Sequence, residues 1–234
     1  MLWRYEISGI DTITLYWGER IDTALARRVH CAAQALQTHL GERLLDVVPS
    51  YASIMLRYDL LQDDLASLLE SVRHILSDLP ENPLDHASEL VELPVFYHPR
   101  VGPDLERIAR HAGLSVDDVI ALHAEQTYHV FAIGFAPGFA YLGEVSSRIA
   151  MPRLATPRPH VPAGSLGIAD RQTAIYPLDS PGGWNLIGRT PVNMFDVNRE
   201  PSSLLRVGQR VRFRPVEQDE YLALGGQLST RQDQ

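Results

Sequence analysis

The sequence has 234 residues, of which 45% are hydrophobic and 21% are charged, and its formal net charge is −8. This length fits one or two domains with ordinary hydrophobic cores. With 21 basic against 29 acidic residues, the chain lacks the basic face that nonspecific nucleic-acid binding needs. No run approaches the ~20 apolar residues of a membrane helix, and the first residues lack the apolar core of a signal peptide. The single cysteine, Cys31, cannot form an internal disulfide, so we expect a cytoplasmic protein.

The N-terminal third has the pattern of a small α+β domain. Alternating residues predict strands, and apolar residues at steps of three and four predict helices, the first of which stops at Gly41. The predicted elements, in order, are strands over 3–7 and 11–16, a helix over 22–40, strands over 43–48 and 51–57, a helix over 61–79 and a strand over 89–97. From the second strand onward the order is β-α-β-β-α-β, which is the split βαβ pattern.

A polar, proline-punctuated segment from Pro80 to His86 predicts an inter-domain linker. Beyond it, two short helices are expected. The first ends at Gly113, and the second begins at Ser115, which forms a capping-box pattern with Asp118. From Thr127 onward the pattern is β. The predicted domains are therefore 1–80, a linker over 81–90, a β domain over 91–218 and a polar tail over 219–234.

Residues 131–191 hold half of the chain's 16 glycines and half of its 16 prolines, interleaved with short apolar runs and aromatic residues. This mixture predicts a compact β body with tight corners, because a disordered segment would be poor in aromatic and branched residues. Within it, Gly138, Phe139 and Tyr141 place bare backbone beside flat rings, as small-molecule pockets require. The alternative is that these rings belong to the core.

Two further stretches have residues that are typical of anion-binding sites. The turn 162–167, with Gly164 and Ser165, offers backbone N–H groups and a hydroxyl. The stretch 181–191 holds Gly182 and Gly183 and places Trp184 and Arg189 at opposite ends of a strand.

Arg153 and Arg158 precede these turns, and with Arg189 they make three guanidiniums near glycine turns. We expect them to form one wall that binds a carboxylate or phosphate. Ser165 has no visible triad, so its expected role is binding rather than nucleophilic attack. The nine histidines show no paired metal-ligand spacing, and no metal site is expected.

Four motifs have amino-acid sequences that are specific enough to identify a family. They read GFAPGFAYLG, PRLATPRPHVPAGSLGI, QTAIYP and SPGGWNLIGRTP, in that order. Together with Gly102-Pro103-Asp104-Leu105 and the Leu122-His123 pair, they closely resemble the family that contains the 5-oxoprolinase B subunit, the first subunit of allophanate hydrolase and the sporulation kinase inhibitor. The resemblance is strong over about 92–216 and weaker before it.

This resemblance implies an α+β fold, with an N-terminal ferredoxin-like domain followed by a C-terminal cyclophilin-like β-barrel. It implies the B subunit of an ATP-dependent 5-oxoprolinase, which hydrolyses 5-oxo-L-proline to L-glutamate, needs the C and A subunits, and is inactive alone. ATP is the expected co-substrate. Alternatives are an inhibitor of a sensor histidine kinase, or a carboxyltransferase-like component of a biotin-dependent urea or allophanate pathway.

The expected catalytic residues are His123 and Arg189, although His123 could instead be a helix-terminal residue favoured by the helix dipole. The expected substrate-binding residues are Gly138, Phe139, Tyr141, Arg153, Arg158, Gly164, Ser165, Gly182, Gly183 and Trp184. The chain departs from the family wording at Ala169, Asp170 and Ala174, where glycines are usual, and at Ala140. Loss of glycine removes easy access to positive φ, so these changes bear on the proposed site.

Overall fold

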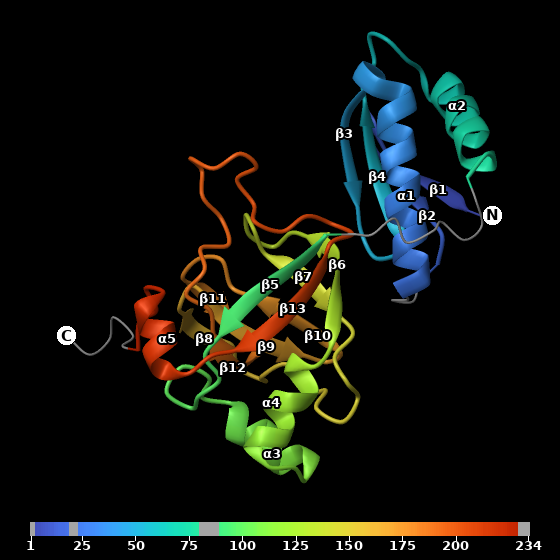
Figure 1. The fold of residues 1–234 in the computed structure, drawn as a ribbon. Helices are drawn as coiled ribbons and strands as arrows, with labels where there is room; N and C mark the ends of the chain where they lie inside the picture. The colour runs from blue at the N-terminus through green and yellow to red at the C-terminus, as the bar shows by residue number, and fades with distance from the viewer. Residues whose placement is uncertain (1–2, 19–22, 80–88, 229–234) are drawn as a thin grey trace. The chain divides into compact units, whose positions relative to one another are not determined.

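The computed structural model describes residues 3–18, 23–79 and 89–228. The chain divides into two compact units, Met1–Ala87 and Ser88–Gln234, and each unit combines helices with strands (Figure 1). The architecture is thus α+β. Of the expected linker, residues 81–88 lie outside the described residues, and residue 90 already begins a strand. None of the described helices has both the length and the apolar character of a membrane span.

The first unit is an antiparallel four-stranded sheet with two helices. Its strand order is β1-β2-β4-β3. Its elements are β1 (Arg4–Gly9), β2 (Thr12–Tyr16), α1 (Thr23–Leu40), the 3₁₀ turn η1 (Gly41–Arg43), β3 (Leu44–Pro49), β4 (Ser53–Tyr58) and α2 (Leu65–Ser77). Apolar residues of α1 and α2 pack against those of β2 and β4 to form one core. The predicted helices and strands of this unit are confirmed, with boundaries shifted by a few residues.

The strand expected to complete the first sheet is placed elsewhere. β5 (Leu90–Val95) pairs in parallel with β13 (Arg210–Pro215) in the second unit. In the first sheet, the edge beside β2 is occupied by β1 instead. A hairpin partner joined by a short turn closes at little entropic cost, and this explains why the local partner β1 takes the edge position.

The second unit is built on a seven-stranded sheet of order β12-β9-β10-β7-β6-β13-β5. At its open edges, the Phe96 backbone N–H donates to Arg189 O (2.9 Å) and the Arg189 N–H donates to Phe96 O (3.0 Å), which brings the sheet close to a closed barrel. The remaining elements are α3 (Leu105–Ala112), α4 (Val116–Ala124), β6 (Thr127–Ile133), β7 (Ala140–Gly143), β8 (Arg158–Val161), β9 (Ser165–Ala169), β10 (Gln172–Ile175), β11 (Ser180–Gly182), β12 (Asn185–Arg189) and α5 (Gln218–Ala223).

The helices expected before the barrel are present. α3 ends at Gly113, whose φ of 66° is the left-handed conformation that glycine adopts at helix ends. α4 begins with the capping box formed by Ser115 and Asp118. Figure 1 shows these two helices beside each other at one end of the sheet.

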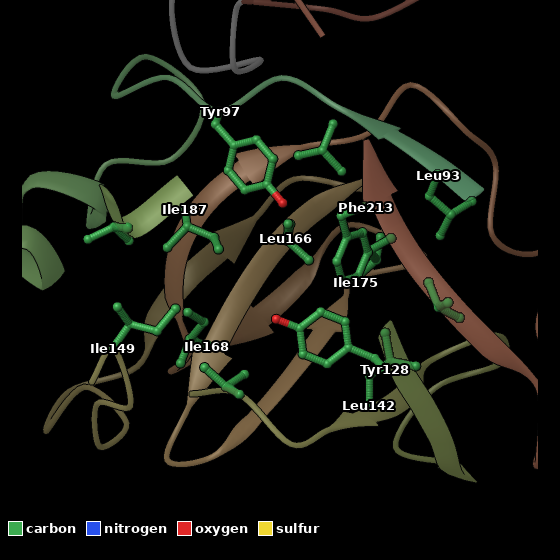
Figure 2. Packing of buried hydrophobic residues seen from close by; sticks show 14 of the residues in the cluster. Leu93, Tyr97, Tyr128, Leu142, Ile149, Leu166, Ile168, Ile175, Ile187 and Phe213 are labelled. Atoms are coloured by element: carbon green, nitrogen blue, oxygen red, sulfur yellow. The ribbon is translucent and has the colours of Figure 1, made fainter. Parts of the chain in front are cut away.

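The barrel sheet carries apolar residues on both faces. Inside, Leu166, Ile168 and Ile187 belong to the large cluster drawn in Figure 2. Because side chains alternate along a strand, Ser165 and Ala169 of β9 point to the opposite face. That outer face holds a second cluster of buried residues, consisting of Phe139, Val161, Ala169, Ala174, Tyr176, Trp184 and Leu186.

The prediction of a polar tail over 219–234 is wrong for its first residues. Residues 218–223 form the helix α5, and Tyr221 within it is fully buried against Phe96, Val101 and Val216. Because polar residues surround Tyr221 in the sequence, the pattern did not indicate that this one aromatic residue is buried. Residues 229–234 lie outside the described residues.

Candidate functional site

The outer cluster is centred on the ring of Phe139, which belongs to one of the stretches predicted to bind substrate. Its centroid is 4.9 Å from that of Tyr141, 5.5 Å from Tyr176 and 5.7 Å from Trp184, in edge-to-face arrangements. Tyr141 and Trp184 are 6.1 Å apart. Such pairs fix one another's orientation. The cluster therefore presents a rigid aromatic wall, of which Tyr141 is only partly buried.

Arg153 adds a positive charge to this wall. Its guanidinium carbon lies 5.8 Å from the centroid of the Trp184 ring, within cation–π range. Arg153 is exposed, and the described residues give it no ion pair. An exposed guanidinium that has no ion pair can receive a small anion.

Arg158 has a different role from Arg153, although both were predicted to bind substrate. Its Nη2 donates to Asp104 Oδ1 (2.8 Å), and its Nη1 donates to the backbone oxygen of Trp184 (3.3 Å). The other oxygen of Asp104 accepts from the N–H of Leu186 (2.7 Å). Asp104 is buried, so this ion pair joins the start of α3 to β8 and β12.

Two buried polar residues here, Asp104 of this ion pair and the nearby Asn185, were not predicted as site residues from the sequence. Asp104 lies in the Gly102–Leu105 motif that resembles the family, and it stands at the N-terminus of α3 without a side-chain cap bond. Asn185 is fully buried; its amide donates to the backbone oxygens of Pro152 (2.9 Å) and Ile168 (3.1 Å), and its oxygen accepts from Arg107 (3.1 Å). Asn185 holds the loop carrying Arg153 against the sheet through its bond to Pro152.

Two of the three glycines near the aromatic wall are needed because neighbouring side chains pack against them. A Cβ at Gly182 would lie 2.3 Å from the Tyr176 hydroxyl, and one at Gly138, whose φ is 79°, would lie 2.8 Å from Cβ of Phe195. Gly183 has ordinary space around it, and its backbone oxygen accepts from the N–H of Leu154 (2.7 Å). Gly138 and Gly182 therefore admit neighbouring side chains.

Phe135 was not among the residues predicted to line a site. It is 67% exposed, its φ is 71°, and its ring meets Phe139 edge to face at 5.2 Å. Positive φ is rare for an aromatic residue and marks sites where the surrounding structure holds strain. Phe135 thus extends the aromatic wall toward solvent.

The prediction that the turn 162–167 cradles an anion through its backbone is wrong. The N–H of Gly164 donates to Tyr176 O (2.7 Å), that of Ser165 to Pro162 O (3.2 Å), and that of Ala163 to Asp179 Oδ1 (2.7 Å). These donors are already used within the chain. Gly164, with φ of 79°, is required because a Cβ there would lie 2.4 Å from Thr190 O.

The three arginines do not form one wall. Arg189 is at the far end of β12 from Trp184, roughly 15 Å along an extended strand, and it pairs there with Ser165 of β9. It is buried, at 6% exposure, and its Nη1 donates to the backbone oxygen of Gln227 (3.1 Å). The structure brings Phe139, Tyr141, Trp184 and Arg153 together, and it places Ser165 and Arg189 in a separate group.

His123 is fully buried inside the barrel, in the last turn of α4. Thr173 Oγ1 donates to Gly167 O (3.0 Å), so it must accept from His123 Nε2 (3.0 Å), which leaves Nδ1 to accept from the Tyr97 hydroxyl (2.8 Å). Burial lowers the pKa of His123 to about 3, so the ring is neutral at pH 7. This geometry supports a structural role and gives no support to a catalytic one.

The residues that depart from the family motifs fit into the structure. Asp170 adopts a φ of 52° at the exposed turn between β9 and β10, a conformation that aspartate tolerates better than most residues. Ala169 and Ala174 are buried in the outer cluster, where their methyl groups pack with the rings. Within the described residues, no group of three or more His, Cys, Asp or Glu side chains is arranged to hold a metal ion.

Comparison with known proteins places this arrangement in a family. The model of the carboxyltransferase domain, subdomain C and D, matches residues 3–205. The chain is 38% identical over 231 residues to the 5-oxoprolinase B subunit of Bacillus subtilis, covering 94% of this chain and 96% of the relative. It is 39% identical over 197 residues to the 5-oxoprolinase B subunit of Escherichia coli O157:H7, covering 81% and 89%.

Solved structures agree on the fold. The structure of TTHA0988 matches with a TM-score of 0.77 at 39% identity over 92% of this chain, which spans 40% of that longer chain. The urea carboxylase of Kluyveromyces lactis matches with a TM-score of 0.71 over 94% of this chain and 22% of its own, and at 19% identity it shows the fold alone. The chain belongs to the carboxyltransferase-domain family, subdomain C and D, together with the 5-oxoprolinase B subunits.

Proposed function

We propose that this chain is the B subunit of an ATP-dependent 5-oxoprolinase, which opens the lactam of 5-oxo-L-proline to give L-glutamate. The observation that carries the proposal is the identity of 38% over 231 residues to a 5-oxoprolinase B subunit, with 96% of that relative covered. A B subunit belongs to a complex of several chains, and we propose the C and A subunits as the partners. The same relatives favour this function over the inhibitor and carboxyltransferase alternatives.

We also propose the finer fold assignment, a ferredoxin-like first unit and a cyclophilin-like barrel. The strand order β1-β2-β4-β3 with two helices supports the ferredoxin-like assignment, with β1 at the sheet edge that the last strand of the ferredoxin pattern would occupy. The nearly closed seven-stranded sheet supports the second. The cytoplasmic location stays a proposal that rests on the single cysteine.

We place substrate recognition at the aromatic wall. The ring of 5-oxoproline is small and flat, so it can lie against the partly buried Tyr141, next to Trp184, while its carboxylate meets Arg153. An unstrained lactam is a poor electrophile, and phosphorylation of its oxygen by ATP supplies the activation. The backbone donors of the turn 162–167 are engaged, so this turn does not fit the phosphates of ATP. We therefore propose that ATP binds on a partner subunit.

The test is reconstitution of the chain with its C and A partners. The complex should release glutamate from 5-oxo-L-proline with ATP consumption, whereas the chain alone should be inactive. Arg153→Gln should lower kcat/KM by roughly tenfold or more while the complex stays assembled, since it removes a charge-assisted contact. The exposed Arg148→Gln is the control. No ATP-coupled release by a fully assembled trio would refute the proposed function.

A further inference from the structure

Two buried polar atoms on the outer face of the barrel have no hydrogen-bond partner among the described residues. They are the hydroxyl oxygen of Ser165, which is fully buried, and Nε of Arg189. Leaving a buried donor or acceptor unpaired is costly, and such groups in native proteins usually have an external partner. Here both belong to one strand pair, which points to one external molecule.

The two atoms face the same space. Ser165 and Arg189 are directly paired on the antiparallel strands β9 and β12, so their side chains project from the same face about 5 Å apart. Gly164 keeps this space open, since a Cβ there would lie 3.3 Å from Cγ of Arg189. The pair is thus a preformed hydroxyl and guanidinium side by side.

The charge of Arg189 is also unbalanced. The described residues include no acidic side chain paired with it, and the acceptor of its Nη1 is the neutral backbone oxygen of Gln227 at 3.1 Å. A buried cation normally has an opposite charge beside it. A carboxylate suits this position, because its two oxygens can accept from the guanidinium edge and from a hydroxyl together.

Arg189 is contacted by a segment that belongs to no strand of the barrel sheet. Gln227 lies beyond the end of α5 and outside every described strand, following Gly225, whose φ is 93°. The Tyr221 hydroxyl donates to Gln227 O (3.1 Å) and accepts from Gln227 N–H (3.2 Å). Burial raises the pKa of Tyr221, although the nearby Arg189 opposes this, so the hydroxyl stays neutral. These two bonds, the one from Arg189, the bond from Gly226 N–H to Tyr221 O (2.9 Å) and the packing of Leu228 against the buried cluster around Tyr221 hold the segment 225–228 closed.

We propose that Ser165 and Arg189 form a second binding site, for the carboxylate of a small molecule, and that the segment 225–228 closes it. In the closed state the Gln227 oxygen occupies the place of one ligand oxygen. The site lies at the opposite end of β12 from Arg153, so it is separate from the aromatic wall. It does not depend on the proposed reaction, although 5-oxoproline and glutamate both carry such a group.

The experiment is calorimetric titration of the full chain with acetate, L-glutamate and inorganic phosphate at constant ionic strength, which needs neither partners nor turnover. Ser165→Ala should weaken acetate binding by about tenfold, because it removes a hydrogen bond to a charged group. The exposed Ser147→Ala is the matched control and should bind as the native chain does. Tyr221→Phe keeps the buried ring but frees Gln227, so it should tighten binding.

Three results would overturn the proposal. The first is failure of both the native chain and Tyr221→Phe to bind acetate. The second is equal affinity in Ser165→Ala and Ser147→Ala, which would mean that buried water alone satisfies these atoms. The third is tighter binding of phosphate than of either carboxylate, which would contradict the assigned ligand class.

Discussion

The two faces of the barrel sheet treat buried polar groups in opposite ways. Inside, His123 and Thr173 are fully buried and each of their polar side-chain atoms has a partner, in the chain of bonds from Tyr97 to Gly167. Outside, Ser165 and Arg189 are also buried, yet each keeps a polar atom without a partner among the described residues. Satisfied networks rigidify a fold, whereas unsatisfied ones need a molecule from outside. The difference separates His123, whose ring nitrogens both have partners, from Arg189, which we propose to bind a ligand, although the sequence suggested a catalytic role for both.

The largest expected effect tests the inner network. His123→Ala removes a ring that stacks on Phe213 at 5.0 Å and leaves Tyr97 and Thr173 without their partner. We expect a loss of about 3–5 kcal/mol in the free energy of unfolding, measured by urea denaturation. The exposed His111→Ala should change little. A stable His123→Ala chain that assembles but is inactive would restore the catalytic assignment.

The next effect separates Arg158 from Arg153. Arg158→Gln leaves the buried Asp104 without its counter-charge, and we expect a loss of about 2–3 kcal/mol in unfolding free energy. Arg153→Gln removes only a contact to the Trp184 face, so stability should stay within about 0.5 kcal/mol while substrate affinity falls. Equal losses of stability would mean that Arg153 is also structural.

A smaller effect is the pH dependence that His123 imparts. Its folded pKa, about 3, is below the unfolded value near 6.5, so the unfolded chain binds more protons between these values. The stability contribution is fully present above about pH 6.5 and is lost as pH falls. The expected slope is about 1.4 kcal/mol per pH unit between pH 6 and 4. The slope should be shallower by that amount in His123→Gln, and an unchanged slope would contradict neutral burial.

The helices and strands of the first unit, and α3 and α4 of the second, could be predicted because their signals are local. The apolar spacing before Gly41 indicated α1, and the Ser115–Asp118 pattern indicated the start of α4, where the capping box is present. The pairing of β5 could not be predicted, since its partner β13 is over a hundred residues away in sequence. Strand periodicity shows which face a residue takes but not which strand lies beside it.

The site residues followed the same rule. The clustering of Phe139, Tyr141 and Trp184 was expected from their glycine-bounded stretches, and the structure brings them together. The separation of Arg189 from Arg153 depends on the length of β12 and on its pairing with β9. The ion pair between Arg158 and Asp104 joins residues 54 positions apart, and no local pattern encodes it.

The most direct test compares two fully buried hydroxyls on neighbouring strands, Thr173 of β10 and Ser165 of β9. Each is replaced by a residue of nearly the same shape, in Thr173→Val and Ser165→Ala, and the unfolding free energies are measured in ligand-free buffer. Thr173→Val should lose about 1–3 kcal/mol, because His123 and Gly167 lose their partner, while Ser165→Ala should change by less than about 0.5 kcal/mol. Equal losses would show that Ser165 is already satisfied within the chain and would contradict the contrast between the two faces.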